Sequence, residues 1–376
     1  MCHNLGHEQH EEEQDTATLP QEFADTFRRF KEFPNIISAA LHFSEHSSSE
    51  STIGGDGFMP WSEWPQDLGF RRPILRQFFN ILAHPTASKV KDVCINNLQN
   101  INDTAFMQSP KVRGVLSGLS TLRLYIVTED HDPAPELNIE MEELHTFIAE
   151  LPPLWLAPAA GNLTSLILYQ YAFFGYCPKL DLRSVHFSQL RTLALGNYVF
   201  SHDWQLDWLK DHASTLENLF LDNCIVVYFS CFGEEDADGY PTELQDQRAD
   251  NYRFFDLTWS LIFDLLREHH DHLRHFRIGK SAIHDRNVSF GITAHEHMDI
   301  DLFPGRYQFF DCTNFTDEDL KELEEGRDID MGSATEGEKA KAFLVNLSKQ
   351  TDADLTSLEQ LLDKIGQPFI RTDVQE

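Results

Sequence analysis

One apolar pattern occurs twice between residues 190 and 228. The spacing Leu-x-x-Leu-x-Leu begins at Leu190 and again at Leu216, 26 residues later. Between the two copies, Trp204 and Trp208 have the spacing of the buried face of a short helix. A strand, a helix and a second strand within 26 residues predict one repeat of a leucine-rich-repeat solenoid.

Further copies of this phrase, with other apolar residues in place of some leucines, extend along the chain. The seven copies begin at residues 36, 90, 119, 163, 190, 216 and 273. Three of the intervals fall in the 20–29 residue band of leucine-rich repeats, and the longer ones contain inserted segments at 45–70, 129–161 and 232–252. The predicted fold is therefore α/β, an irregular leucine-rich-repeat solenoid with parallel strands on its concave face and helices on its convex face.

Helical periodicity precedes most of the copies. We predict helices over 21–33 and 103–116, a helix that starts at Pro73, and a helix inside the second insertion that stops before Pro152, because the residue before a proline disfavours the helical conformation. The third insertion, 232–252, is acidic and expected to be mobile.

The two ends of the chain differ from the repeats. Residues 1–15 read as a disordered acidic tail, 16–300 as the repeat region and 301–376 as a helical segment. This segment is expected to contain a helix from a capping box at Thr316-x-x-Asp319 to about Gly326, an acidic linker at 327–337, and helices at 338–349 and 352–365. It either caps the last repeat or extends free.

The alternation of side chains along a strand predicts a binding surface. Leucines of the phrase point into the stack, and the residues between them point outward along the concave face. The partner-binding candidates are Asn96, Arg123, Tyr125, Tyr169, Phe220, Asp222 and Arg277. Aromatic side chains make good anchors, so Tyr125, Tyr169 and Phe220 are expected to carry the affinity. The alternative is that an insertion shields them or that they pack on each other.

Charge and cysteine usage narrow the partners. The formal charge is −31, from 30 basic and 61 acidic residues, which argues against binding to nucleic acid or anionic membrane and favours a basic partner only weakly. The six cysteines form no CxxC pair. The start of the chain lacks the features of a signal peptide, and no apolar run is long enough for a membrane span. The expected compartment is cytoplasm or nucleus.

The search for catalytic or metal-binding patterns gives weak candidates. The cluster His269, His270, His272 and His275 could bind a metal, but it lies at the end of a predicted helix, where histidines suit the helix dipole. His295-Glu296-His297 lacks the HExxH spacing. We therefore expect no enzyme, no metal and no cofactor. Trp204 and Trp208 are expected to pack a convex helix rather than form a ligand cage, and Cys224 is expected to be structural. Trp61 and Trp64 in the first insertion are alternative contact residues.

At 190–228 the chain resembles the leucine-rich-repeat region of filamentous-fungal F-box-like proteins. The resemblance is carried by Leu193, Leu195, Gly196, Phe200, Asp203-Trp204-Gln205, Asp207-Trp208, His212, Thr215-Leu216, Leu219, Leu221-Asp222 and Cys224. In that family an F-box module binds the Skp-type adaptor of a cullin ubiquitin ligase, and the repeats select the target. Leu19-Pro20-Gln21-Glu22 matches the start of such a module, but about a dozen residues follow before Pro34, so we expect the recognition half without the module.

These expectations favour a non-catalytic protein-recognition module that resembles a ligase substrate receptor. A scaffold unrelated to ubiquitin is the first alternative. A metal-dependent enzyme that uses the cluster His269–His275 is the second.

Overall fold

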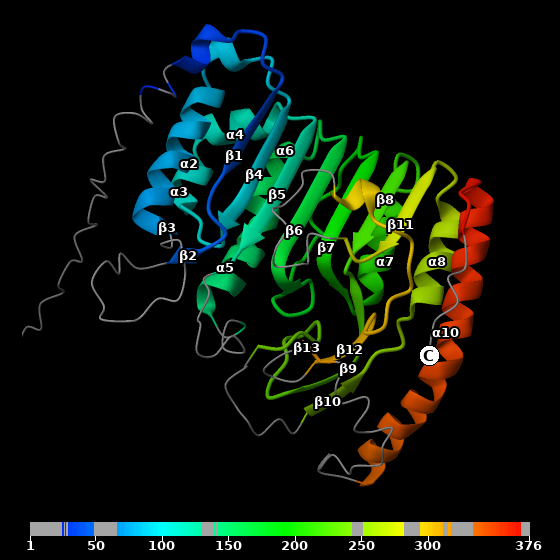
Figure 1. The fold of residues 1–376 in the computed structure, drawn as a ribbon. Coiled ribbons are helices and arrows are strands. Elements are labelled where there is room, and N and C mark those ends of the chain that lie inside the picture. The colour runs from blue at the N-terminus through cyan, green and yellow to red at the C-terminus, as the bar shows by residue number, and fades with distance from the viewer. Residues whose placement is uncertain are drawn as a thin grey trace, which may run out of the picture.

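The computed structural model has mixed α/β architecture, with an open parallel sheet that is not closed into a barrel (Figure 1). It describes residues 25, 27, 29–48, 66–128, 139, 141–242, 251–281, 294–310, 315–316 and 334–369. Seven neighbouring strands of the sheet are mutually parallel: β1 (Ser38–His42), β4 (Asp92–Gln99), β5 (Thr121–Val127), β6 (Ser165–Phe174), β7 (Thr192–Phe200), β8 (Asn218–Asp222) and β11 (His275–Gly279).

Each copy of the apolar phrase begins just before one of these strands and places its last two apolar residues within the strand, and the copies lie in register. The pairing of Leu166 with Leu193 and of Leu193 with Leu219 places equivalent leucines side by side. At the strand starts, one carbonyl accepts two N–H groups from the next strand, as Arg191 O does from Glu217 and Asn218 at 2.8 Å each. The prediction that the seven segments are adjacent parallel strands is confirmed.

The helices differ in the side of the sheet on which they lie: most of them cover one side, whereas η6 crosses the other (Figure 1). They are η1 (Phe30–Glu32), α2 (Leu68–Leu82), η2 (Pro85–Ala87), α3 (Thr104–Met107), α4 (Pro110–Ser117), α5 (Glu142–Leu151), η4 (Pro152–Leu156), α6 (Ala157–Ala159), α7 (Asp203–Asp211), α8 (Trp259–His269), η6 (Ala294–His297) and α10 (Ala334–Ile365). The phrase leucines and the inner residues of these helices form one core, in which Leu193, Phe147 and Phe263 have exposures of 0–1%.

One predicted helix boundary is wrong, and a second helix ends where predicted but is followed by further helical turns. Pro73 lies inside α2, which begins at Leu68 after Asp67, whose Oδ1 accepts the Phe70 N–H at 2.7 Å and caps the helix. The helix predicted to stop before Pro152 does so, since α5 ends at Leu151, but the chain continues as the π-helical turn η4 and then α6. Burial of the apolar side chains Leu154 and Trp155 accompanies this continuation.

A second branch of the sheet was not predicted. Beyond Asn197, β7 pairs with β9 (Ile225–Phe232), which also pairs with β10 (Asn251–Phe254) and β12 (Tyr307–Phe310). β12 pairs in turn with β13 (Phe315–Thr316), and β2 (Ser47–Ser48) pairs with β3 (Gln66–Asp67) in a separate small sheet. The strand at β12 lies after residue 300, where the repeat phrase is absent, so the part of the chain expected to be helical also contributes to the sheet.

The C-terminal helix caps the sheet. A single helix, α10, replaces the two predicted helices and packs along α8 (Figure 1). Past its end, Gln367 accepts the Phe276 N–H at 3.0 Å and donates to the Phe276 carbonyl at 2.8 Å. One side-chain amide thus takes the place of a further strand beside β11. The expected acidic tail, the linker up to residue 333, Trp61, Trp64 and the region from Asp317 to Gly326 lie outside the described residues.

Within the described part of the chain, no helix combines the length and apolar character needed to cross a membrane.

Candidate functional site

The sheet face opposite the helices was predicted to carry the partner-binding residues. The structure brings six residues of this face into one cluster, which we call the outer-face cluster: Cys94, Tyr125, Ile167, Tyr169, Ala194 and Phe220. Tyr125 and Tyr169 have exposures of 0% and 1%, and their ring centroids are 5.2 Å apart. The expectation that these aromatic rings line an open surface is therefore corrected, and the alternative that they pack on each other is what the structure has.

Gly196 makes this packing possible. It follows Leu195 on β7 and points toward the outer face, where a Cβ atom would lie 2.1 Å from the Tyr169 ring. No real side chain tolerates such a contact, so the ring occupies the space that the glycine leaves. Gly196, one of the residues that carry the family resemblance, thus allows the outer-face cluster to pack.

A crossing segment, residues 294–301, covers part of the cluster. His295 lies over it, with its ring centroid 4.9 Å from that of Phe220 and 6.3 Å from that of Tyr169. The segment is attached to β11: the Asp301 N–H donates to the Ile278 carbonyl at 2.8 Å, and Arg277 donates to the Met298 carbonyl. Burial lowers the pKa of His295, because the apolar surroundings disfavour the imidazolium.

Asp222 is a buried hub rather than an exposed contact. Its exposure is 0%, and it accepts hydrogen bonds from the Tyr169 hydroxyl at 2.8 Å, the Ser281 N–H at 2.8 Å and the Ser281 hydroxyl. Burial, followed by the neighbouring Asp222 charge, raises the pKa of Tyr169 well above its usual value. Asp222 therefore connects β8 to the chain after β11 and holds the Tyr169 hydroxyl.

The other candidates separate into buried and accessible residues. Asn96 has an exposure of 2% and its amide is 2.8 Å from the His42 ring. Arg123 keeps 23% of its side chain exposed while it pairs with Asp92 at 3.1 Å. Arg277 is half-buried against the crossing segment. Of the seven predicted residues, Arg123 and Arg277 are thus the two that a partner could touch without rearrangement of the described chain.

Three asparagines were missed although the sequence carries their signal. Asn97, Asn197 and Asn223 each lie seven residues after the start of a phrase and have positive φ angles of 58°, 61° and 49°. Their side chains reach the preceding strand: Asn197 donates to the Gln170 carbonyl at 2.7 Å, and Asn223 donates to Asn197 Oδ1 at 2.6 Å. Asparagine tolerates the left-handed conformation better than other non-glycine residues. Asn97 and Asn197 accompany shifts of the strand register in β4 and between β6 and β7, and Asn223 lies in the turn between β8 and β9.

Cys224 is structural, as predicted. Its buried thiol donates to the Leu195 carbonyl at 3.3 Å. Burial raises the pKa of the thiol, which keeps it protonated and unreactive at neutral pH. Trp208 packs into the core at 7% exposure, whereas Asp203 and Asp207 are exposed, as expected for a helix that covers the sheet.

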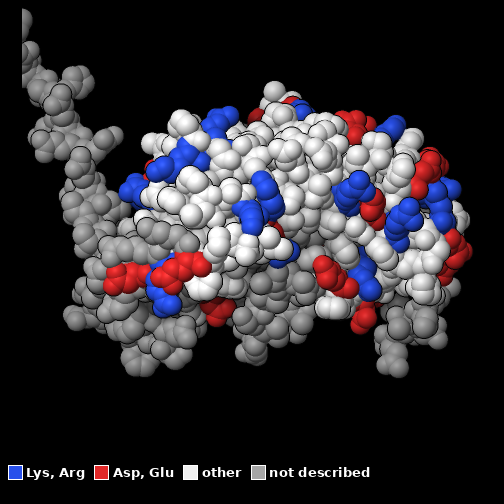
Figure 2. Space-filling model, turned by 90° about the horizontal axis from the view of Figure 1, so that it is seen from above, with Lys and Arg blue, Asp and Glu red and all other residues white. Residues whose placement is uncertain are grey.

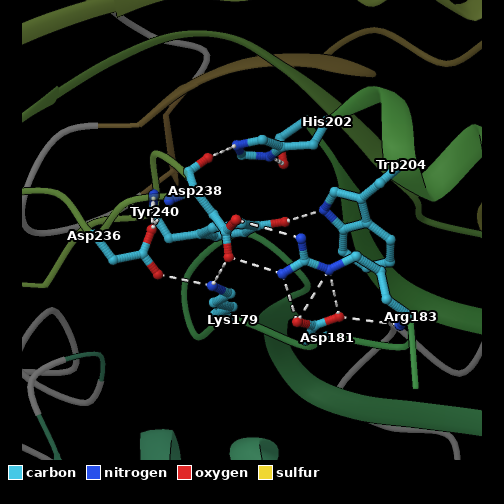
Figure 3. A network of polar contacts seen from close by, with 9 residues as sticks. Lys179, Asp181, Arg183, His202, Trp204, Asp236, Asp238 and Tyr240 are labelled. Carbon is cyan, nitrogen blue, oxygen red and sulfur yellow. Dashed lines mark hydrogen bonds and ion pairs between the residues drawn. The ribbon is translucent and has the colours of Figure 1, made fainter. Parts of the chain in front are cut away.

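A polar network joins the 175–183 loop to the acidic segment 233–242 (Figure 3). Lys179 Nζ is 2.7 Å from Asp236 and 2.9 Å from Asp238, and Arg183 bridges Asp238 to Asp181 with 2.7 Å contacts to each. These two cations hold the pKa values of the carboxyl groups below their usual range. The described half of the third insertion is therefore fixed, contrary to the expectation that 232–252 is mobile.

Aromatic rings complete this network. The Tyr240 ring stacks on His202 with centroids 4.2 Å apart, and the Tyr240 hydroxyl accepts a hydrogen bond from Trp204 Nε1 at 2.8 Å. Lys179 lies over the other side of Tyr240 at 4.3 Å. Lys179 and Arg183 are paired with carboxylates, and both ring nitrogens of His202 have hydrogen-bond partners. This arrangement fastens a loop and offers no nucleophile or general base.

The histidine cluster at the end of α8 is dispersed. His269, His272 and His275 are exposed, whereas His270 is buried at 1% exposure. Among the described residues, no group of three His, Cys, Asp or Glu side chains is arranged to hold a metal ion.

The buried His270 makes stability depend on pH. Burial lowers the pKa of His270 from 6.5 to about 4, so the unfolded chain binds a proton more readily than the folded one. As far as His270 is concerned, the folded protein is most stable above about pH 6.5. The free energy of unfolding then falls by about 3 kcal/mol in all as the pH decreases toward 4. Thermal unfolding measured from pH 7 to pH 4 should show this loss. His270→Phe should make the decline shallower, and His272→Phe, at an exposed site, should not. Equal slopes would contradict the assignment.

No family model matches the chain, and neither a curated protein nor a solved structure matches it.

Proposed function

We propose that the protein is a non-catalytic protein-recognition module of the leucine-rich-repeat type. The observation that carries the proposal is the register of the seven parallel strands, which places equivalent residues of successive repeats side by side. Repeat proteins of this kind use such extended faces to bind other macromolecules. The absence of a grouped acid, base and nucleophile among the described contacts favours binding over catalysis.

The proposed contact face consists of the accessible rim of the outer sheet face and the crossing segment. Arg123 and Arg277 lie on this rim, and Glu296 and His297 of the crossing segment are exposed beside it. The aromatic rings of the outer-face cluster are buried and support the rim from below. Arginine is enriched at energetic centres of protein interfaces, so Arg123 is the residue on which we base the test.

The resemblance to F-box-like proteins suggests the partner class. By that resemblance, the protein would act as a substrate receptor linked to a cullin-type ubiquitin ligase through a Skp-type adaptor. A scaffold unrelated to ubiquitin is the second candidate. Co-purification of the adaptor with the full chain separates the two: its presence supports the receptor, and retained targets without the adaptor support the scaffold.

The test is affinity capture with the immobilised full chain and two charge-reversal variants. We expect Arg123→Glu to lose at least one protein that the unmodified chain retains, by about tenfold in recovered amount. Lys210→Glu, an exposed position on α7 on the helical side, should retain it. Thermal unfolding of both variants shows that each is folded. Identical captured sets for all three chains would refute the proposed contact face.

A further inference from the structure

The region that contains β4 and β5 has the opposite charge to the rest of the chain. Between residues 68 and 127 there are eight Lys or Arg residues against two Asp, a formal charge of +6. The whole chain carries −31, so the remaining residues carry −37. All residues from 68 to 127 are described. A partner that binds to this region through charge therefore contacts a basic part of an otherwise acidic protein.

Four of the basic residues are engaged within the protein. Arg71 is buried among backbone carbonyls, Arg76 pairs with Asp103, and Arg123 pairs with Asp92. Arg72 is half-buried. These contacts use both aspartates of the region, which leaves the other four cations without a described carboxylate from it.

The remaining four cations are exposed, and two neighbouring segments carry them, the stretch just before β4 and the helix α4. The four cations are Lys89, Lys91, Lys111 and Arg113. Three of them contact neutral oxygens: Lys89 reaches Asn35 at 2.6 Å, Lys91 reaches the Gly118 carbonyl at 2.9 Å, and Lys111 reaches Asn80 at 2.7 Å. Because Gly118 ends α4, which carries Lys111 and Arg113, these contacts connect the strand start to the helix. Figure 2 looks down on this end, and in the upper left of the picture the charged side chains are mostly basic, whereas acidic side chains gather at the lower left.

Exposed apolar side chains adjoin the cations. Phe33 and Ile37 keep 53% and 67% of their surface exposed, among the largest values for apolar residues of the described chain. Ile37 is directly next to Lys91, whose N–H donates to the Ile37 carbonyl at 2.9 Å. Glu32, just before Phe33, is paired with Arg29. Together the four cations and the two apolar residues form what we call the basic corner.

We propose that the basic corner is a docking surface for an acidic, partly apolar segment of a partner protein. Charge complementarity supports an acidic partner, and Phe33 and Ile37 supply apolar contacts that a purely electrostatic ligand would not use. A nucleic acid fits less well, because a long polyanion would extend beyond the four cations toward the rest of the protein, whose residues carry a formal charge of −37. A short acidic peptide segment needs only the corner itself. This surface does not depend on the contact face proposed above.

The proposal is tested with the full chain and a fluorescein-labelled synthetic peptide that repeats Glu-Glu-Leu, followed by fluorescence anisotropy. We expect saturable binding at low ionic strength that weakens as salt rises toward 0.15 M, where the Debye length is about 8 Å. The double variant Lys91→Glu, Arg113→Glu should bind about tenfold more weakly. Phe33→Ser, Ile37→Ser should weaken binding without changing its salt dependence.

The matched control is the double variant Lys210→Glu, Arg274→Glu. It makes the same change in net charge at exposed positions outside the corner and should bind the peptide as the unmodified chain does. Equal loss in both double variants would overturn the proposal, because it would mean that net charge alone acts. An absence of saturable binding would also overturn it, as would tighter binding of oligothymidylate than of the peptide. None of these outcomes bears on Arg123, so failure here is distinct from failure of the proposed contact face.

Discussion

Replacement of Asp354 by Ala is expected to lower the free energy of unfolding by about 3–5 kcal/mol, because it leaves a buried guanidinium without its counter-ion. Asp354 has an exposure of 0%, and its Oδ2 lies 3.2 Å from the nitrogens of Arg306, which is 7% exposed. A charge at such a site is stable only when it is paired and hydrogen-bonded.

Asp354 also holds three elements together. Its Oδ1 accepts the Ser260 N–H at the start of α8 and the Tyr307 hydroxyl of β12, each at 3.0 Å. Gln350 of α10 donates to the same oxygen at 3.0 Å. The loss of the carboxylate would therefore leave several buried donors unpaired at once, and α10 would lose one of its polar contacts with α8, the hydrogen bond from the Ser260 N–H.

Chemical unfolding followed by circular dichroism measures this effect. Asp363→Ala is the control, since Asp363 is exposed on the same helix and a surface substitution changes stability by at most about 0.5 kcal/mol. Burial raises the pKa of Asp354 despite its partners, so desolvation of the pair is costly. The double variant Asp354→Leu, Arg306→Met should thus be less destabilised than Asp354→Ala alone. If Asp354→Ala lowered the free energy of unfolding by less than about 1 kcal/mol, the conclusion that Asp354 holds these three elements together would be contradicted.

The repeat phrase was predictable because burial acts through local periodicity. Each copy has leucines or similar residues two apart, and such side chains share one face of a strand. Once the copies are set in parallel, their order along the chain becomes their order in the sheet. The helices at 203–211 and 259–269 follow from the same rule with the helical period, whereas the helix predicted over 103–116 is divided into α3 and α4.

The candidate site could not be predicted to the same extent, because the exposure of its residues depends on segments that are distant in the sequence. Tyr125 and Tyr169 do point to the outer face, as the alternation requires, but His295 covers that face from a segment more than 120 residues away. Nothing near Tyr169 in sequence indicates this. Likewise Asp354 reads as an ordinary helix residue, and only its tertiary contact with Arg306 makes it a hub.

Arg71 is the second buried charge on which the fold depends. It has an exposure of 3% and lies on α2 at the N-terminal end of the sheet. Its guanidinium donates to four backbone carbonyls: Ser44 and Asn97 at 2.5 and 2.7 Å, and His46 and Gln66 at 3.0 Å each. It also lies 5.1 Å from the centroid of the Phe43 ring. Burial lowers its pKa to about 10, so it stays charged at neutral pH.

These four carbonyls come from the ends of β1 and β4, from the residue before β2 and from β3, so one planar donor group joins the two small strands to the edge of the large sheet. Arg71→Met keeps the aliphatic stem but leaves the carbonyls without donors, at about 1–3 kcal/mol for each one that water cannot reach. We expect a loss of about 3–5 kcal/mol in the free energy of unfolding. Arg71→Lys should recover only a small part, because an ammonium cannot span four acceptors in one plane.

Chemical unfolding of both variants, with hydrogen exchange of residues 42–48 and 66–70, measures the effect. Exchange should accelerate most in these two stretches, because their backbone carbonyls face the missing guanidinium. Arg113→Met is the control, since Arg113 is exposed and its replacement should change stability by at most about 0.5 kcal/mol. If Arg71→Lys were as stable as the unmodified chain, the argument from a planar donor with four acceptors would fail, and a single charge at this position would be sufficient.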